Sequence, residues 1–190
     1  MIPSLKNKTD LFSHEHIGKI GKNCKINHTV QFFGDSDNFE IGDNVRIDAF
    51  CILSGKIKIG SHIHIAAGTY LFGSSGIILE NYVSLSSRVS IYSVTDDYRE
   101  GYLTNPTIPD EFKKVKGGLV ILKKHVIVGA GSIIMPGIVL DEGASVGALT
   151  FVRKSVPSYT IISGNPAIVV GKRDAERLNS LEKKHKDILC

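Results

Sequence analysis

The chain has 190 residues, 42% hydrophobic and 22% charged, which is typical of one soluble domain with a sizeable core and excludes extensive disorder. The net charge of +4 is mild and its cations are dispersed, so a nucleic-acid surface is not indicated. The three cysteines form no CxxC motif, which argues against a disulfide framework and a zinc ribbon. Without a signal-peptide pattern or a membrane-span stretch, we expect a soluble, cytoplasmic protein.

Residues 1–16 are expected to form a short, partly helical lead-in, and a repeat array begins at Ile17. A first regular series then places an aliphatic residue at every sixth position: Ile41, Ile47, Leu53, Ile59, Ile65 and Leu71. Six residues are not a whole number of helical turns, so the stripe would rotate around a helix, whereas short strands joined by turns keep it on one side. The pattern therefore predicts stacked parallel strands, in a domain that spans residues 17–171.

The repeat is interrupted twice after Leu71. The segment SSGIILE shifts its phase by two residues before Leu79, Leu85 and Ile91 resume the step. Residues 95–117 then contain no hexad, and a loop of that length inside a compact solenoid usually has a function. We therefore predict an excursion loop over residues 95–117.

A second series follows the loop, with Leu122, Val128, Ile134, Leu140, Val146 and Val152 again at every sixth position. Beyond it, residues 172–190 place Leu178, Leu181, His185 and Ile188 at helical spacing, with charges between them. This predicts a C-terminal amphipathic helix whose apolar stripe packs on the solenoid or on a neighbouring subunit. The expected fold is thus all-β with one terminal helix.

The two hexad series, the loop and the closing SGNPA together resemble the hexapeptide-repeat acyltransferases. The resemblance implies a left-handed parallel β-helix and a homotrimer, with acetyl-CoA in a cleft between adjacent β-helices and the acceptor near the excursion loop. Hexads alone do not specify the chemistry, because γ-class carbonic anhydrases share them. Within the family, the chain is most similar to sugar acetyltransferases, including those that act on nucleotide-linked amino sugars.

The segment SVTDDY, residues 93–98, carries the most informative departure from the family. In galactoside-type enzymes a segment like SVTGHP supplies a His as general base, and here Asp96 and Asp97 stand at the Gly and His places. A hydroxyl acceptor gains ~10²- to 10⁴-fold from a positioned base, whereas an amine needs less help. The resemblance therefore implies N-acylation of a nucleotide-linked amino sugar, with dTDP-4-amino-4,6-dideoxyglucose as the named candidate and surface polysaccharide as the destination.

Several candidate residues have alternatives that the sequence leaves open. Asp97 is a base or amine-orienting group, or a loop aspartate that caps a turn, and Asp96 is a second candidate. His125 is a rival base, expected to point outward beside the loop, or a surface histidine that only contacts the loop. His64 can meet substrate from a neighbouring subunit, or it is a solvated position on the outside of the coil.

The resemblance places acetyl-CoA against the turns that contain Gly129, Ala130, Gly131 and Ala148, where no large side chain blocks the pantetheine arm. Cations near the exit of the coil would bind its phosphates, and the candidates are Arg153, Lys154, Lys172 and above all Arg173. For a nucleotide sugar, Tyr98 and Tyr102 are expected to stack on the base and Asn105 to bond a sugar hydroxyl.

Three other functions remain as alternatives. An O-acetyltransferase would use His125 as its base. A metal-dependent hydratase of the γ-carbonic-anhydrase kind would need interface histidines, but no H-x4-H pair occurs, and we expect no metal. A catalytically silent scaffold is suggested only by the missing family His.

Overall fold

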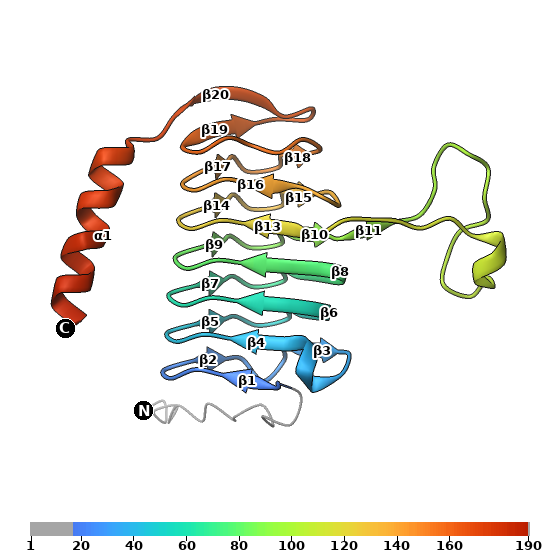
Figure 1. The fold of residues 1–190 in the computed structure, drawn as a ribbon, viewed down its shortest axis with the longest axis horizontal. Coiled ribbons are helices and arrows are strands. Elements are labelled where there is room, and N and C mark those ends of the chain that lie inside the picture. The colour runs from blue at the N-terminus through green and yellow to red at the C-terminus, as the bar shows by residue number, and fades with distance from the viewer. Residues whose placement is uncertain (1–16, 190) are drawn as a thin grey trace, which may run out of the picture.

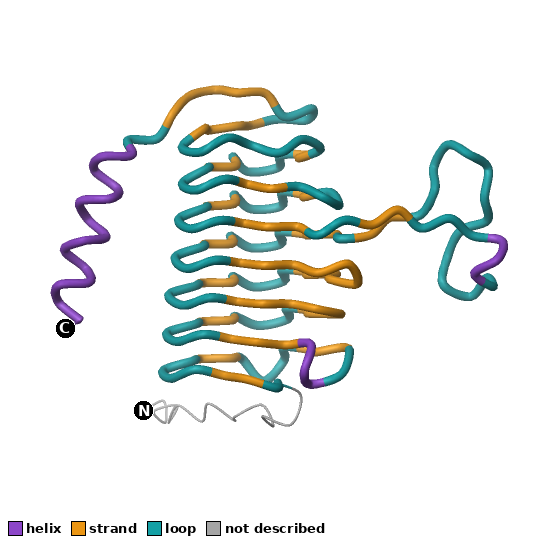
Figure 2. The backbone as a smooth tube through the Cα atoms, viewed as in Figure 1, coloured by secondary structure: helices purple, strands orange, loops and turns teal. Residues whose placement is uncertain are grey.

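This computed structural model describes residues 17–189, so the predicted lead-in, residues 1–16, lies outside the described residues. The chain winds into a column of stacked coils, with a long loop projecting from one side and a helix standing on the other (Figure 1). Each coil consists of short strands joined by turns (Figure 2). The predicted solenoid of parallel strands with a terminal helix is confirmed.

Three faces make up the column, and nearly all strand pairs are parallel. The first face contains β3 (Gln31–Phe33), the starts of β6 (Ile52–Ile59) and β8 (Tyr70–Leu79), β10 (Ser90–Tyr92), β15 (Ile133–Ile134) and β18 (Phe151–Val152). The second contains β1 (Lys19–Ile20), β4 (Phe39–Ile41), the ends of β6 and β8, β13 (Val120–Leu122) and β16 (Val139–Leu140).

The third face contains β2 (Lys25–Ile26), β5 (Arg46–Ile47), β7 (His64–Ile65), β9 (Ser84–Leu85), β14 (Ile127–Val128), β17 (Ser145–Val146) and β19 (Thr160–Ser163). Strand β20 (Ile168–Lys172) pairs antiparallel with β19 and closes the column. Helix α1 (Ala175–Leu189) follows, beginning slightly later than residue 172, where the sequence predicted it.

The hexad residues form the core because they stack in register from coil to coil. Leu53 pairs with Leu71, and Ile91 pairs with Ile134 across the place where the loop leaves. All four side chains are 0% exposed. Each such side chain contributes roughly 1.5–3 kcal/mol relative to an exposed one, so the column is stabilised by many similar increments along its length.

Departures from the hexad lie at the corner between the first and second faces. Strand β8 takes a longer path around this corner than β6, and the register shifts between Gly55 and Ile57. The shift in the phase of the repeat at SSGIILE therefore corresponds to a wider turn of β8 at this corner. An earlier break in the repeat holds a short 3-10 helix, η2 (Ser36–Asn38), before β4. Insertions are thus tolerated at this corner, where they do not disturb the strands on the faces.

The corner between the second and third faces carries a column of residues with positive φ. Asn44 is followed upward by His62, Tyr82 and His125, which recur at the same place in successive coils. The ring of Tyr82 is stacked between His62, at 5.0 Å, and His125, at 4.9 Å. We call His62, Tyr82 and His125 the corner stack.

Helix α1 docks on the corner stack through polar groups. The Glu182 carboxylate lies 2.8 Å from His125 Nε2, 2.6 Å from Lys124 Nζ and 2.6 Å from Lys186 Nζ. His185 Nδ1 lies 3.3 Å from the Tyr82 hydroxyl. Burial alone would raise the pKa of Glu182, but these hydrogen bonds lower it to about 2.

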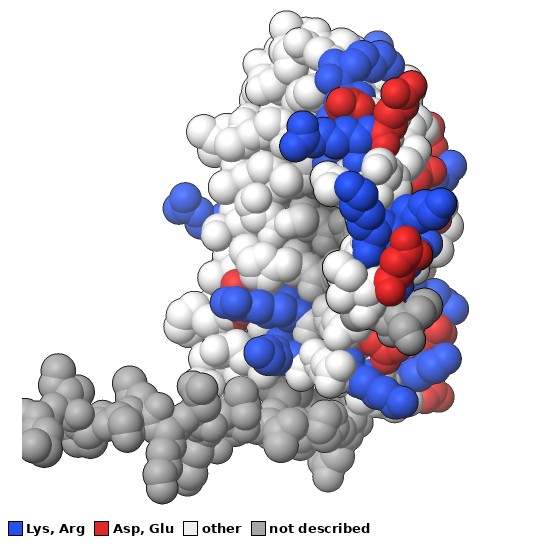
Figure 3. All heavy atoms as spheres, turned by 90° about the vertical axis from the view of Figure 1, so that its left-hand side faces the viewer, with Lys and Arg blue, Asp and Glu red and all other residues white. Residues whose placement is uncertain are grey.

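The predicted packing of the helix stripe on the solenoid holds for only part of the stripe, because Leu178 and Leu181 line a small cavity with the corner stack and Ile188 does not. Leu181 is 53% exposed and Ile188 is 82% exposed, whereas Glu182 is buried. The helix side that faces the column therefore carries a paired charge, and the alternative that the stripe packs on a neighbouring subunit stays a prediction. Basic and acidic side chains are interspersed in one vertical band on this side of the molecule (Figure 3).

Acid should release helix α1 from the column. A carboxylate whose pKa falls from 4.5 to about 2 stabilises docking fully above about pH 4.5, and this contribution is lost as the pH falls toward 2. The protection of residues 175–188 against hydrogen exchange, corrected at each pH for the intrinsic exchange rate, should fall over this range. In Glu182→Gln the protection should already be low at neutral pH, and equal protection in the two proteins would show that Glu182 does not hold the helix on the column.

Gly129 should be required for stability because the next coil lies directly against it. A Cβ at this position would lie 2.4 Å from the amide nitrogen of Ala148, which is backbone and cannot yield easily. Gly129→Ala should cost about 1–3 kcal/mol in the free energy of unfolding, measured by denaturant titration. Gly171→Ala is the matched control, because its Cβ would meet only Ile161 Cδ1 at 3.6 Å.

Candidate active site

The excursion loop leaves the column through a two-stranded neck. Strands β11 (Val94–Thr95) and β12 (Lys116–Gly117) pair antiparallel, with Thr95 opposite Lys116. Beyond the neck the chain forms an open loop that contains the 3-10 helix η3 (Asp110–Phe112), and it projects well away from the column (Figures 1 and 2). The acidic pair Asp96 and Asp97 therefore stands at the point where the neck opens into the loop.

A cavity of about 990 Å³ lies between the base of the loop and the first face. The loop contributes Asp96, Tyr98, Arg99, Asn105 and Lys113 to its lining, and the column contributes Tyr92, Ile133, Met135, Phe151 and Arg153 among others. Three basic groups and one carboxylate thus share the cavity with aromatic rings. This composition suits an anionic ligand that also carries a flat ring and an amine.

The two adjacent aspartates have different surroundings. Asp96 lines the cavity, and its Oδ2 accepts a long hydrogen bond of 3.4 Å from the Asn105 N–H. Asp97 is 5% exposed, and its Oδ2 accepts a hydrogen bond of 2.6 Å from the Glu100 N–H. Of the alternatives that the sequence left open for Asp97, the turn-capping arrangement is the one in the structure, and Asp96 is the carboxylate that borders the cavity.

Asp97 is held in its ionised form. Burial raises the pKa of this carboxyl, but the backbone N–H groups of Glu100 and Arg99 and the nearby Lys116 ammonium together keep it below its usual range. Lys116 Nζ lies 3.4 Å from Asp97 Oδ1, which is buried and accepts no hydrogen bond. Asp97 is therefore a charged anchor within the loop at neutral pH.

The predicted substrate residues divide between the cavity and other places. Tyr98 and Asn105 line the cavity, as the stacking and hydrogen-bonding roles require. Tyr102 does not line it, and its ring lies 5.4 Å from Lys114 Nζ. His64 lies in β7 on the third face, where its Nε2 is 2.8 Å from Asp48 Oδ2. Within this subunit the structure brings only the first two to the site.

The expectation that His125 points outward beside the loop is wrong. Its side chain is 8% exposed, beneath helix α1, and its Nε2 lies 2.8 Å from Glu182. It lines a small cavity with Leu178 and the rest of the corner stack, and no loop residue takes part. The turn before β14 adopts a positive φ at His125, which carries the ring into the stack and away from solvent.

The residues that were predicted to bind the coenzyme lie in different parts of the column. Gly129, Ala130, Gly131 and Ala148 form the corner between the third and first faces, where the Ala130 carbonyl accepts the Leu149 N–H. Lys154 lines a second cavity, of about 740 Å³, which shares Phe151 and Arg153 with the loop cavity. The two cavities are therefore adjoining parts of one groove that runs from the loop toward the closing strands.

Arg173 has a different position from the one predicted. Its Nη1 donates to the carbonyl oxygens of His125, at 2.8 Å, and Gly143, at 3.3 Å. These carbonyls belong to the corner between the second and third faces, and Arg173 lines neither part of the groove. The guanidinium fastens the chain leading into α1 to the column, so we do not retain it as a phosphate ligand.

Sequence reasoning missed Tyr92, Arg99 and Lys113 as members of the cavity. Tyr92 follows the inward-facing Ile91 and therefore points outward. Its ring stacks on the ring of Phe72, with 5.2 Å between the two ring centroids. That alternation was a usable signal for Tyr92. The two basic residues lie in the loop, and no repeat fixes where a loop side chain points.

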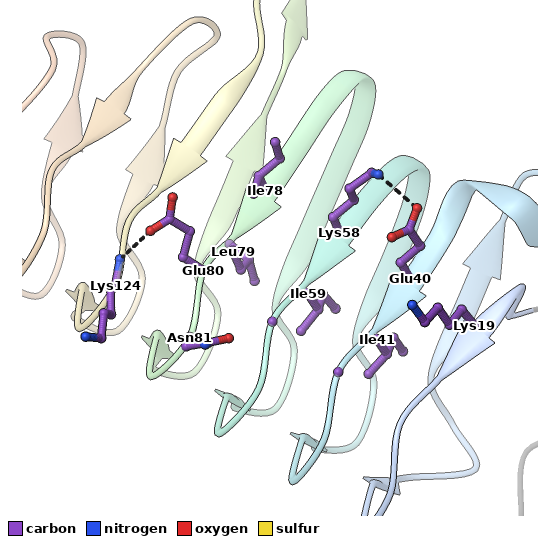
Figure 4. A pocket seen from close by; sticks show the side chains of 12 residues that line it. Lys19, Glu40, Ile41, Lys58, Ile59, Ile78, Leu79, Glu80, Asn81 and Lys124 are labelled. Carbon is purple, nitrogen blue, oxygen red and sulfur yellow. Dashed lines mark hydrogen bonds and ion pairs between the residues drawn. The ribbon is translucent and has the colours of Figure 1, made fainter. Parts of the chain in front are cut away.

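A further hollow, of about 470 Å³, lies on the second face (Figure 4). Its charged residues bond to protein groups: Lys58 Nζ lies 2.9 Å from Glu40, and Glu80 accepts the Lys124 N–H at 3.1 Å. No residue of the excursion loop lines it. The loop cavity is therefore the better candidate site. Among residues 17–189, no cluster of histidine, cysteine and carboxylate side chains is arranged to hold a metal ion.

Comparisons with known proteins identify the family to which this chain belongs. A family model described as bacterial transferase hexapeptide (six repeats) matches residues 40–73. The dTDP-4-amino-4,6-dideoxy-D-glucose acyltransferase of Escherichia coli is 41% identical over 162 residues, 84% of each chain. This chain therefore belongs to the hexapeptide-repeat acyltransferases, and its left-handed parallel β-helix is the fold of that family.

Solved structures extend the comparison. AntD, an N-acyltransferase from Bacillus cereus, in complex with dTDP and 3-hydroxybutyryl-CoA, is 41% identical, with a TM-score of 0.87 over 92% of this chain and 93% of that one. An AntD variant in complex with dTDP-4-amino-4,6-dideoxyglucose and coenzyme A gives a TM-score of 0.86 at 41% identity over 90% and 92% of the two chains.

Across residues 17–189, helix α1 lacks the length and apolar character needed to cross a bilayer.

His125→Asn should leave acyl transfer almost unchanged. Asparagine tolerates a positive φ and removes the imidazole; it is too short to reach Glu182, but Lys124 and Lys186 still pair with that carboxylate. We expect kcat within about threefold of wild type, whereas loss of a general base costs ~10²- to 10⁴-fold. Release of free CoA measures the rate, and a loss of a hundredfold would restore His125 as a catalytic candidate.

Proposed function

We propose that this protein transfers an acyl group from a coenzyme A thioester to the amine of a nucleotide-linked amino sugar. The proposed acceptor is dTDP-4-amino-4,6-dideoxyglucose, the sugar named for the Escherichia coli relative and bound in an AntD structure. The observation that carries the proposal is a single carboxylate, Asp96, set among basic and aromatic side chains in the loop cavity. Acetyl-CoA is the expected acyl donor. The alternative donor is 3-hydroxybutyryl-CoA, which is bound in an AntD structure.

The residues of the cavity suit the parts of such an acceptor. Arg99, Lys113 and Arg153 supply the positive charge that a pyrophosphate requires. Tyr92 and Tyr98 provide ring faces for a base, and Asn105 provides a polar group for the sugar. In the adjoining part of the groove, Lys154 suits the phosphates of coenzyme A.

The reaction needs little from the protein beyond orientation and a place for one proton. The amine nitrogen attacks the thioester carbonyl, a C–N bond forms, and the C–S bond breaks as the thiolate of coenzyme A leaves. The nitrogen becomes acidic once it has attacked, and its proton passes to the leaving sulfur or through a carboxylate. Asp96 can accept a hydrogen bond from the amine and hold its lone pair toward the carbonyl.

We further propose a homotrimer that works in the cytoplasm, where acyl-CoA and nucleotide sugars are made, and that supplies surface polysaccharide. The loop supports association with other copies because it exposes large apolar side chains that do not line the cavity. Leu103 is 55% exposed and Phe112 is 50% exposed. Side chains of this kind are enriched at protein interfaces when they form one continuous surface.

Asp96→Asn should separate acceptor chemistry from folding. The amide keeps the shape of the side chain but loses its charge, so we expect kcat/KM for the amino sugar to fall roughly 10²-fold. The KM for acyl-CoA should change little, because Asp96 lies at the loop end of the groove. CoA release is measured with dTDP-4-amino-4,6-dideoxyglucose and with a neutral galactoside; preference for the galactoside would replace N-acylation by O-acylation.

A further inference from the structure

Four charged side chains form a chain of contacts beside the neck of the excursion loop. Glu100 pairs with Lys114 through Oε2 and with Lys116 through Oε1, the latter at 2.7 Å. Lys116 also lies 3.4 Å from Asp97 Oδ1. Lys116 thus contacts both carboxylates, whereas Lys114 contacts Glu100 and not Asp97.

Lys116 comes from the opposite strand of the neck. It belongs to β12 and stands across from Thr95, the last residue of β11 before the two aspartates. Its ammonium therefore ties the outgoing chain of the loop to the returning chain. The segment that carries Asp96 and Asp97 is held at both ends, by the neck on one side and by the Asp97 turn on the other.

The two aspartates are adjacent in the chain, but their side chains lie in different places, since Asp96 lines the cavity and Asp97 is buried outside it. Asp97 turns into the ion cluster and caps the Glu100 N–H. Asp96 is thereby left to face the cavity, where it accepts the long hydrogen bond from the Asn105 N–H. A change that frees Asp97 would free the backbone on which Asp96 is carried.

We infer that Lys116 is a positioning residue, which holds Asp97 and through it fixes Asp96 in the cavity for the acceptor amine. The inference rests on the proposed function for the role of Asp96, but the anchoring itself is a property of the loop. A buried carboxylate oxygen without a hydrogen-bond donor is costly, and Lys116 is the cation that offsets this cost for Asp97 Oδ1.

The titration of Asp97 agrees with this arrangement. Burial opposes its ionisation, while two backbone N–H groups and Lys116 favour it, and the net pKa lies below the usual range. Removing the ammonium takes away one of the favourable contributions, so the pKa of Asp97 must rise. Asp97 would then become protonated at a higher pH, and the hydrogen bond that it accepts from the Glu100 N–H would weaken at that pH.

The test compares Lys116→Met with Lys114→Met. Both variants remove one lysine from Glu100 and leave the other in place, and only the first removes the contact with Asp97. Both lysines are about half exposed, so neither change should unfold the column. Lys116→Arg is included because it keeps the charge and should restore the wild-type behaviour.

With acyl-CoA and the amino sugar, Lys116→Met should lower kcat/KM roughly tenfold or more, since small misplacements of a positioning group are costly. Lys114→Met should stay within about twofold of wild type. The pKa of the Asp97 carboxyl, followed by NMR titration, should be higher in Lys116→Met than in Lys114→Met, a shift that a general loss of packing would not produce. Equal activity and equal Asp97 titration in the two variants would overturn the inference.

Hydrogen exchange of a peptide covering residues 96–102 gives a readout that does not depend on the acceptor. Exchange should be faster in Lys116→Met than in Lys114→Met, because the Glu100 amide loses its fixed acceptor. If neither the wild-type protein nor any variant acylates the amino sugar, the proposed function fails. The exchange comparison still tests whether Lys116 anchors Asp97. Faster exchange in Lys116→Met supports the anchor, and equal exchange refutes it.

Discussion

The hydrogen bonding of each coil to the next is the constraint on which the rest of this structure depends. Backbone groups pair in register along all three faces, so a residue on one coil lies directly above its counterpart on the coil below. Most inward positions therefore carry aliphatic side chains that stack on one another, as at Leu53 and Leu71. Where two coils approach most closely, as at Gly129, even a methyl group has no space.

The same constraint decides where the chain can do something other than repeat. An insertion within a face would break the pairing of a strand with both of its neighbours, whereas an insertion at a corner leaves the faces intact. The wide turn of β8 and the excursion loop both leave at the corner between the first and second faces. Function on this scaffold is thus concentrated at a corner, beside a flat face that supplies Tyr92, Phe151 and Arg153.

Sequence reasoning predicted those parts of the molecule that the repeat controls. The hexads gave the parallel solenoid, the wide corner, the position of the loop and the inward side chains, because a fixed period determines which side of a strand each residue faces. The alternation of side chains around Ile91 also indicates that Tyr92 faces outward. Tyr98 and Asn105 were predicted to be at the site from their place in the loop.

The remaining site residues depend on contacts that no period encodes. His125 occupies a corner with a positive φ, so its side chain packs on Tyr82 and Glu182 rather than extending outward as an ordinary hexad position would. Glu182 reverses the expected packing of α1 because Lys124, His125 and Lys186 together compensate for its burial. Arg173 was assigned from its charge and place in the chain, whereas its partners are two carbonyls on a corner.

The adjacent aspartates show why a motif of two like residues need not have two like roles. Two carboxylates that both faced a cavity already lined by basic groups would repel each other, and each would favour protonation of the other. Turning Asp97 toward Glu100 N–H and Lys116 removes one charge from the cavity and uses it to fix the backbone. A loop that projects from its column on only a two-stranded neck needs such an internal anchor, because the position of Asp96 is only as defined as the segment that carries it.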